Sequence, residues 1–105
     1  MYNKNVERKL IKMNRKTIIE WHNGEQYELN AHIGCFGCMI EVDIRRVTHP
    51  ERKFFRTVLE DTRSFFIDDY ETLEAGCKHC FEKFIKAYEE EIARRKKINN
   101  FFKNA

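Results

Sequence analysis

Four cysteines in two pairs are the residues of this chain with the clearest chemistry. Cys35 and Cys38 form one CxxC unit, and Cys77 and Cys80 form the other. A two-residue gap lets a backbone turn direct both sulfurs at one ion, and two such turns complete a closed tetrahedral site. The spacing therefore predicts one structural Zn²⁺ held by four thiolates, with iron or an iron–sulfur cluster as the less common occupant of such a site.

A redox dithiol and structural disulfides are the other interpretations of these cysteines. A redox CxxC begins a helix after a strand of a βαβ unit, and the sequence around the two pairs shows no such unit. Disulfides form in oxidising compartments, yet the first residues lack the apolar segment of a secretory signal. The sequence also has no apolar stretch long enough to cross a bilayer. We therefore expect a cytoplasmic protein with reduced cysteines and no membrane partner.

Turn residues and periodicity predict the strands that would position the cysteines. Residues 17–22 and 25–30 flank Asn23-Gly24, a dipeptide typical of the two-residue type I′ hairpin. Apolar and charged residues alternate over 40–44, which indicates a half-buried strand just after the first cysteine pair.

A second hairpin is predicted further along the chain. Two runs of aromatic and β-branched residues, 53–59 and 63–67, are separated by the polar residues 60–62, which are expected to form the turn. Trp21 belongs to the first hairpin and is expected to pack against the core.

Residues 77–98 are predicted to form one long helix, because no proline or glycine interrupts them and apolar side chains recur at helical spacing. This stripe, expected to cover the sheet, consists of Phe81, Phe84, Ile85, Tyr88 and Ile92. The second cysteine pair then falls in the first helical turn, where the helix dipole stabilises thiolates.

The length and composition fit one small domain. A chain of 105 residues with 42% hydrophobic residues can bury only a modest core, so a bound metal would supply much of the stability. Residues 1–16 indicate a basic N-terminal helix or arm, and residues 17–105 the domain itself. The predicted fold class is α+β: a small zinc-stabilised domain with antiparallel hairpins and a long C-terminal helix.

The order of a cysteine knuckle, β structure and a helix carrying the second cysteine pair resembles a treble-clef zinc finger over about residues 29–98. Within that class the chain is similar in part to HNH endonucleases. In many of these enzymes the fold lies between two CxxC pairs at about this separation. His49, which precedes a proline, matches the family's general base, which activates water for phosphodiester attack with the help of a metal. The chain departs from the family pattern at Thr48, at Asp68-Asp69 and at Phe81, where the family has an acid, an asparagine and a metal-binding histidine.

Basic residues gather at the two ends of the chain. Residues 1–16 hold six Lys or Arg and one acid, residues 78–105 hold eight and four, and residues 17–77 hold six and twelve. This distribution suits a polyanionic partner at the ends. The candidate phosphate contacts are Lys9, Lys12, Arg15, Lys16, Arg94, Arg95, Lys96 and Lys97.

The sequence therefore predicts a non-catalytic zinc-finger binding module, a small regulator that contacts nucleic acid through its basic ends. One alternative is a regulator or inhibitor that docks on a larger enzyme through apolar residues such as Phe101 and Phe102. Another is an HNH-like, metal-dependent nuclease that uses His49.

Overall fold

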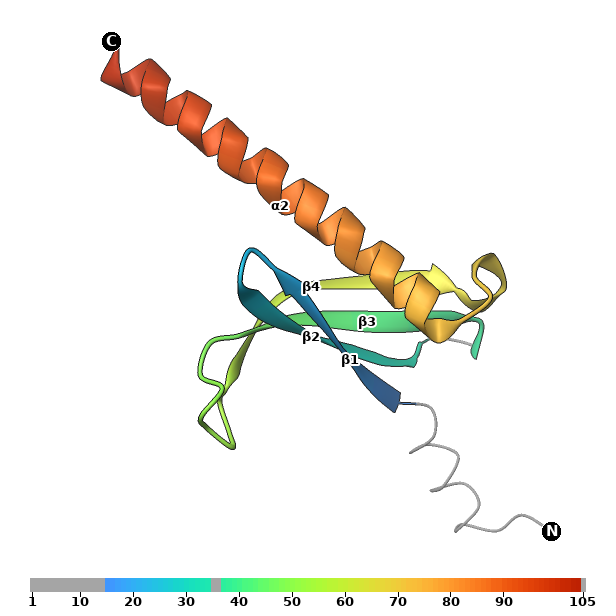
Figure 1. Ribbon diagram of the computed structural model, residues 1–105. Helices are drawn as coiled ribbons and strands as arrows, with labels where there is room; N and C mark the ends of the chain where they lie inside the picture. Colours follow the sequence, from blue (N-terminus) through green and yellow to red (C-terminus); the bar gives the residue numbers. More distant parts are fainter. Residues whose placement is uncertain (1–14, 35–36, 105) are drawn as a thin grey trace, which may run out of the picture.

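Four strands form one antiparallel sheet, and a long helix follows them (Figure 1). The computed structural model describes residues 15–34 and 37–104. The elements are β1 (Arg15–His22), β2 (Glu25–Ile33), β3 (Met39–Val47), β4 (Thr57–Phe66), the 3₁₀ helix η2 (Ile67–Asp69) and α2 (Leu73–Lys103). Neighbours in the sheet are neighbours in sequence, in the order β1-β2-β3-β4. The predicted α+β class, with antiparallel strands and a long C-terminal helix, is confirmed.

The predicted first hairpin is confirmed in both its strands and its turn. His22 pairs with Glu25 across the turn, and the register continues without interruption to the pair of Arg15 and His32. Asn23 and Gly24 have φ angles of 51° and 78°, the positive values that a type I′ turn requires. The hairpin is longer than predicted, because β1 begins at Arg15.

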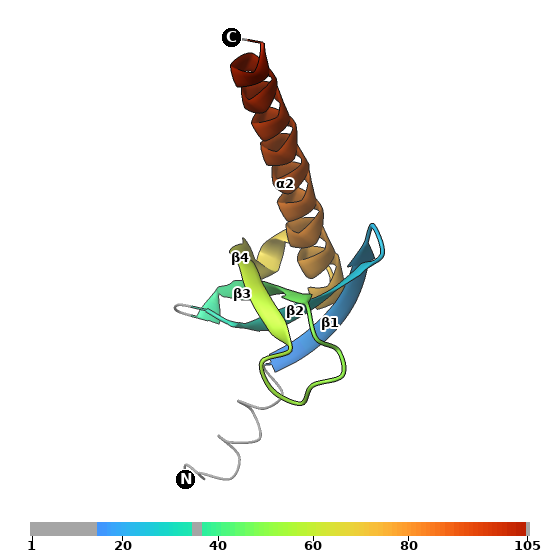
Figure 2. The same cartoon turned by 90° about the vertical axis from the view of Figure 1, so that its left-hand side faces the viewer.

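The core lies between one face of the sheet and the first half of α2 (Figure 2). The alternation predicted for β3 is confirmed, since Val42 and Ile44 are fully buried and their neighbours are not. The buried residues are Tyr27, Leu29, Ala31, Val42, Ile44, Phe65, Cys77, Cys80, Phe81 and Phe84. Alternate residues of β2 and β3 thus form the floor that α2 covers.

The prediction of a second hairpin with its turn at 60–62 is wrong. These residues lie inside β4, which pairs with β3 along its whole length. Ile44 pairs with Asp61 and Arg45 with Leu59, so Glu60 is the extra residue of a β-bulge. A polar triplet fits a bulge as well as a turn, and only the pairing with β3 distinguishes the two. The connection between β3 and β4 is instead the loop 48–56.

The helix is longer at both ends than the predicted range 77–98. It begins at Leu73, where the Thr72 hydroxyl caps it by accepting a hydrogen bond from the Ala75 N–H at 3.1 Å. Gly76 does not end the helix. A Cβ at Gly76 would overlap the ring of Phe65, so this glycine lets α2 approach β4 closely.

Only the first half of α2 covers the sheet. Its buried residues end at Phe84, and the later apolar residues Tyr88 and Ile92 are 45% and 38% exposed. From there the helix projects away from the sheet (Figure 1). The predicted core stripe is therefore correct for the first half of the helix and wrong for the second. The predicted packing of Trp21 is also wrong, because this residue is 62% exposed.

Replacing Gly76 with alanine tests this close approach. Alanine normally stabilises a helix interior by about 1 kcal/mol relative to glycine. Gly76→Ala should instead lower the free energy of unfolding by about 1–3 kcal/mol, because the new methyl group must displace Phe65. Chemical denaturation measures the change. Ala93→Gly, at an exposed helical position, is the matched control and reports propensity alone. A Gly76→Ala protein that is more stable than the parent would contradict the packing described.

Candidate functional site

Cys77 and Cys80 lie on the sheet-facing side of α2 and are buried in the core. Because α2 begins at Leu73, Cys77 lies in the second helical turn and Cys80 at the start of the third, and not in the predicted first turn. Burial raises the pKa of the Cys77 thiol to about 11 and also raises the pKa of Cys80. In the protein without a metal, both thiols are therefore protonated at neutral pH, and the dipole effect expected at a helix start is outweighed by desolvation.

Cys38 is exposed and lies in the connection between β2 and β3. Its carbonyl oxygen accepts a hydrogen bond from the Ile67 N–H at 3.1 Å, at the end of β4. Close by, Met39 and Cys80 line the same cavity of about 310 Å³. Cys38 and the start of α2 therefore lie at the same end of the sheet.

The four-cysteine zinc site stays a prediction. Among residues 15–34 and 37–104, no three His, Cys, Asp or Glu side chains are gathered so that they could hold a metal. Cys35, one of the four predicted ligands, lies outside the described residues. The described chain thus supplies two buried thiols and one exposed cysteine, and it does not show a treble-clef metal centre.

The histidines near the cysteine pairs have partners of their own. Nε2 of His32 is 3.0 Å from Oε2 of Glu41, on the neighbouring strand. The ring of His79 packs against Tyr70 with a centroid distance of 5.5 Å. His32 is thus held by a polar contact with a carboxylate, and His79 by packing against an aromatic ring.

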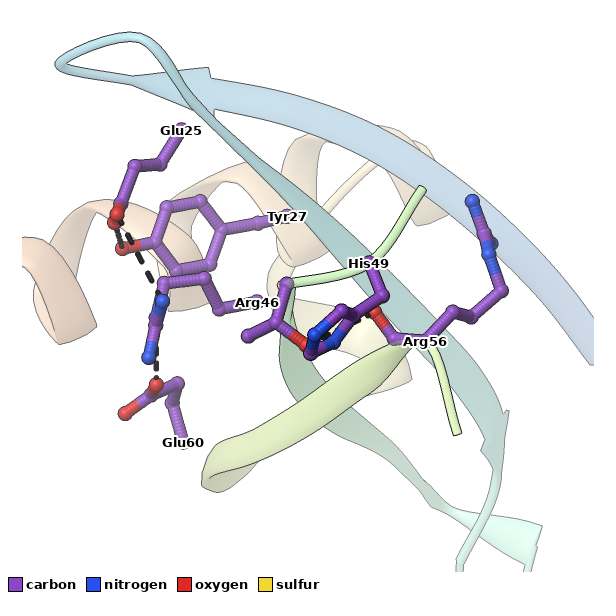
Figure 3. Close-up of polar contacts among 7 residues, drawn as sticks. Glu25, Tyr27, Arg46, His49, Arg56 and Glu60 are labelled. Atoms are coloured by element: carbon purple, nitrogen blue, oxygen red, sulfur yellow. Dashed lines mark hydrogen bonds and ion pairs between the residues drawn. The ribbon is translucent and has the colours of Figure 1, made fainter. Parts of the chain in front are cut away.

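His49 is the second residue of the β3–β4 loop and helps to close it (Figure 3). Its Nδ1 is 3.0 Å from the Thr48 hydroxyl, and the backbone N–H groups of Thr48 and His49 donate to the Arg56 carbonyl at 2.9 and 3.1 Å. Asp68-Asp69 lies beyond the other end of β4, a strand of about 30 Å at 3.3 Å per residue. Phe81 is buried against Tyr27. His49 and Asp68-Asp69, which the HNH resemblance would bring together, are thus held apart.

An ion-pair network occupies the neighbouring part of the sheet (Figure 3). Arg46 Nε donates to Glu60 at 2.9 Å, and an Arg46 guanidinium nitrogen is 3.7 Å from Glu25. The Tyr27 hydroxyl donates to Glu25 at 3.5 Å, and burial together with this carboxylate raises the pKa of Tyr27 to about 12. The network compensates the charge of Glu60 at the bulge, which is a structural role.

Lys16, from the N-terminal basic cluster, lies far from the second predicted cluster on α2. Lys16 pairs with Glu74 in the first turn of α2, whereas Arg94 begins the second cluster 20 residues later. At 1.5 Å per residue this is about 30 Å along the helix. Arg15 and Lys16 are the first residues of β1, and Lys9 and Lys12 lie outside the described residues.

The projecting end of α2 concentrates positive charge and exposed apolar side chains. Residues 93–104 hold five Lys or Arg and no acid. Arg94 and Arg95 both pair with Glu91, yet their side chains remain 69% and 75% exposed. Phe101 and Phe102 are 68% and 80% exposed. This cationic segment (residues 93–104) is called here the helix tail.

Sequence analysis missed a second exposed aromatic pair. Phe54 and Phe55 are 76% and 90% exposed in the β3–β4 loop, and Phe55 has a φ of 55°, unusual for a bulky residue. The sequence interpretation placed both in a strand on their β propensity. Pro50 and the charged residues after it were the available signal for a longer loop.

No family model, curated protein or solved structure matches this chain. None of the helices described is long and apolar enough to cross a membrane.

Proposed function

We propose that this protein is a non-catalytic binding module that contacts nucleic acid through the helix tail. The observation that carries the proposal is the projection of this cationic segment away from the sheet (Figure 1). A helix that stands clear of its own domain can approach a polyanion without a clash from the sheet, and the major groove of DNA admits a helix of this width.

The chemistry of the helix tail fits contacts to phosphate. Arg94, Arg95, Lys96 and Lys97 point to several sides of the helix, since successive residues are separated by about 100°. Such a ring of cations suits electrostatic contacts that do not depend on sequence. Phe101 and Phe102 add apolar surface that could stack on bases. The distance from Lys16 supports a contact made by α2 without β1.

Charge reversal on the helix tail should weaken nucleic-acid binding. We expect Lys96→Glu/Lys97→Glu to reduce affinity for a double-stranded DNA probe roughly tenfold or more at low salt, and to reduce the slope of log K against log salt by about 2. Fluorescence anisotropy over a salt series gives both values. Lys78→Glu/Lys83→Glu is the matched control, because it makes the same charge change on exposed positions in the half of α2 that covers the sheet.

Equal losses in both double variants would show that only net charge matters and would reject the helix tail as the contact. If the parent protein does not bind at low salt, the proposal fails as a whole.

Docking on a protein is the second candidate, supported by the apolar residues of the projecting half of α2. Tyr88, Ile92 and Ile98 are 38–47% exposed, and Phe101 and Phe102 are more exposed still. An amphipathic helix of this kind can bind in a groove of a larger protein, including an enzyme that the module regulates or inhibits. Loss of binding in Phe101→Ala/Phe102→Ala with an unchanged salt slope would favour this candidate.

We also propose, from the cysteine spacing, that one structural zinc joins the two pairs in a cytoplasmic protein. The position of Cys38 at the same end of the sheet as Cys77 and Cys80 supports this. A nuclease reaction at His49 is not part of the proposal, because His49 and Asp68-Asp69 lie beyond opposite ends of β4.

Native mass spectrometry tests the zinc directly. The expected mass corresponds to one Zn²⁺ per chain with four deprotonated cysteines, and a chelator should abolish the near-UV circular dichroism. Cys38→Ser should lower zinc affinity while Cys77 and Cys80 stay buried. A metal-free, folded protein in which the buried thiols resist alkylation and Cys38 reacts would overturn the zinc proposal and leave the nucleic-acid proposal untouched.

A further inference from the structure

Within residues 15–34 and 37–104, strand β1 is an edge of the sheet and has no bulge that would protect it against pairing. The sheet order makes β1 and β4 the two edge strands. β4 carries a bulge at Glu60 and charged neighbours at Asp61 and Arg63, which are devices that discourage edge pairing. β1 pairs with β2 over eight consecutive residues without a bulge, and its centre, Thr17-Ile18-Ile19, is uncharged. A regular edge of this kind can accept a further strand.

The register determines which backbone groups of β1 face the open edge. In a two-residue hairpin the residues that flank the turn exchange both backbone hydrogen bonds, and this pattern alternates along an antiparallel pair. His22 flanks the turn, so the even-numbered residues of β1 bond to β2. The N–H and C=O groups of Arg15, Thr17, Ile19 and Trp21 therefore point outward. An added antiparallel strand must pair through these odd-numbered residues.

The side chains of β1 are complementary to those of a second β1 around Ile18. In an antiparallel pair of two copies centred on Ile18, Lys16 stands opposite Glu20 and Arg15 stands opposite Trp21. The first pair joins opposite charges, and the second places a guanidinium beside an indole, an arrangement that is favourable in water-exposed sites. In this register the odd-numbered residues form the hydrogen-bonded pairs, as the open edge requires.

We propose that two copies of this chain associate by antiparallel pairing of their β1 strands, with the two-fold axis at Ile18. The contact is isologous, so each complementary pair occurs twice. It joins the sheets into one of eight strands and leaves α2 of both copies on the same face. The helix tails stay outside the contact, so this inference is independent of the nucleic-acid proposal.

Several exposed groups in β1 gain a partner in this arrangement. Trp21 is 62% exposed, and among residues 15–34 and 37–104 no hydrogen bond or ion pair holds the side chain of Glu20 or Arg15. Lys16 already pairs with Glu74 of its own helix, on the face of the sheet that α2 covers. An ammonium group has three donors, so Lys16 can contact Glu74 and Glu20 of the second copy together.

The contact is short, and its strength should depend on concentration. Residues 15–21 extend about 23 Å at 3.3 Å per residue. Interfaces of this extent bury less surface than a permanent dimer does, which places the pair among weak, reversible associations.

A charge exchange across the axis tests both the pairing and its register. Lys16→Glu places two acids opposite each other, and Glu20→Lys places two ammonium groups opposite each other, twice per dimer in both cases. We expect each variant alone to raise the dimer dissociation constant roughly tenfold in sedimentation equilibrium. An equimolar mixture of the two variants should associate as strongly as the parent protein, because every pair is again of opposite charge. Circular dichroism confirms that both variants are folded.

Ile19→Pro provides a second, independent disruption. Ile19 is exposed and its N–H faces the open edge, so proline removes an edge donor without removing a hydrogen bond to β2. This variant should be monomeric and folded. A parent protein that stays monomeric up to about 1 mM would overturn the proposal. So would a dimer that neither the charge variants nor Ile19→Pro weakens, since its contact must then lie elsewhere, such as on the helix tail.

Discussion

The close contact of α2 with the sheet at Gly76 is the constraint on which the rest of the structure depends. Here the ring of Phe65 occupies the space that a side chain would fill, and the helix backbone approaches the strands. This approach buries Cys77, Phe81 and Phe84 against the alternate residues of β2 and β3. Because the helix is anchored only at this end, its remaining turns extend beyond the sheet.

The anchored and projecting halves of α2 have different chemical roles. The anchored half supplies apolar side chains to the core and holds there two thiols whose pKa is raised by burial. The projecting half is solvated, and its charge changes from acidic at Glu89–91 to basic in the helix tail. His22 at the end of the first hairpin lies 3.2 Å from Glu89, near the point where the helix leaves the sheet. One continuous helix thus joins a structural element to a candidate binding element.

The two edge strands, β1 and β4, differ in how readily a further strand could pair with them. The bulge in β4 is held by the pairing of Arg46 with Glu60, and it disrupts the regular row of backbone groups that an additional strand would need. The first hairpin imposes a regular register on β1 and leaves a regular row exposed. At β1, exposed backbone groups and side-chain complementarity occur together.

Local sequence determined the elements whose signals are contained within a few residues. Asn23-Gly24 specified the first hairpin, because few other dipeptides accept two positive φ angles, and the alternation over 40–44 specified a half-buried strand. Helical spacing identified α2, and clustered charge identified the helix tail.

Tertiary structure alone decided the features that depend on distant partners. The residues 60–62 became a bulge and not a turn because β3 lies beside them, and the apolar stripe of α2 is half exposed because the sheet ends beneath it. The same geometry separates Lys16 from the helix tail and holds His49 away from Asp68-Asp69. The spacing of residues in a sequence indicates which of them can share a local turn. It does not indicate how far a neighbouring strand extends, and the extent of the strands decided both the bulge at 60–62 and the exposure of the second half of α2.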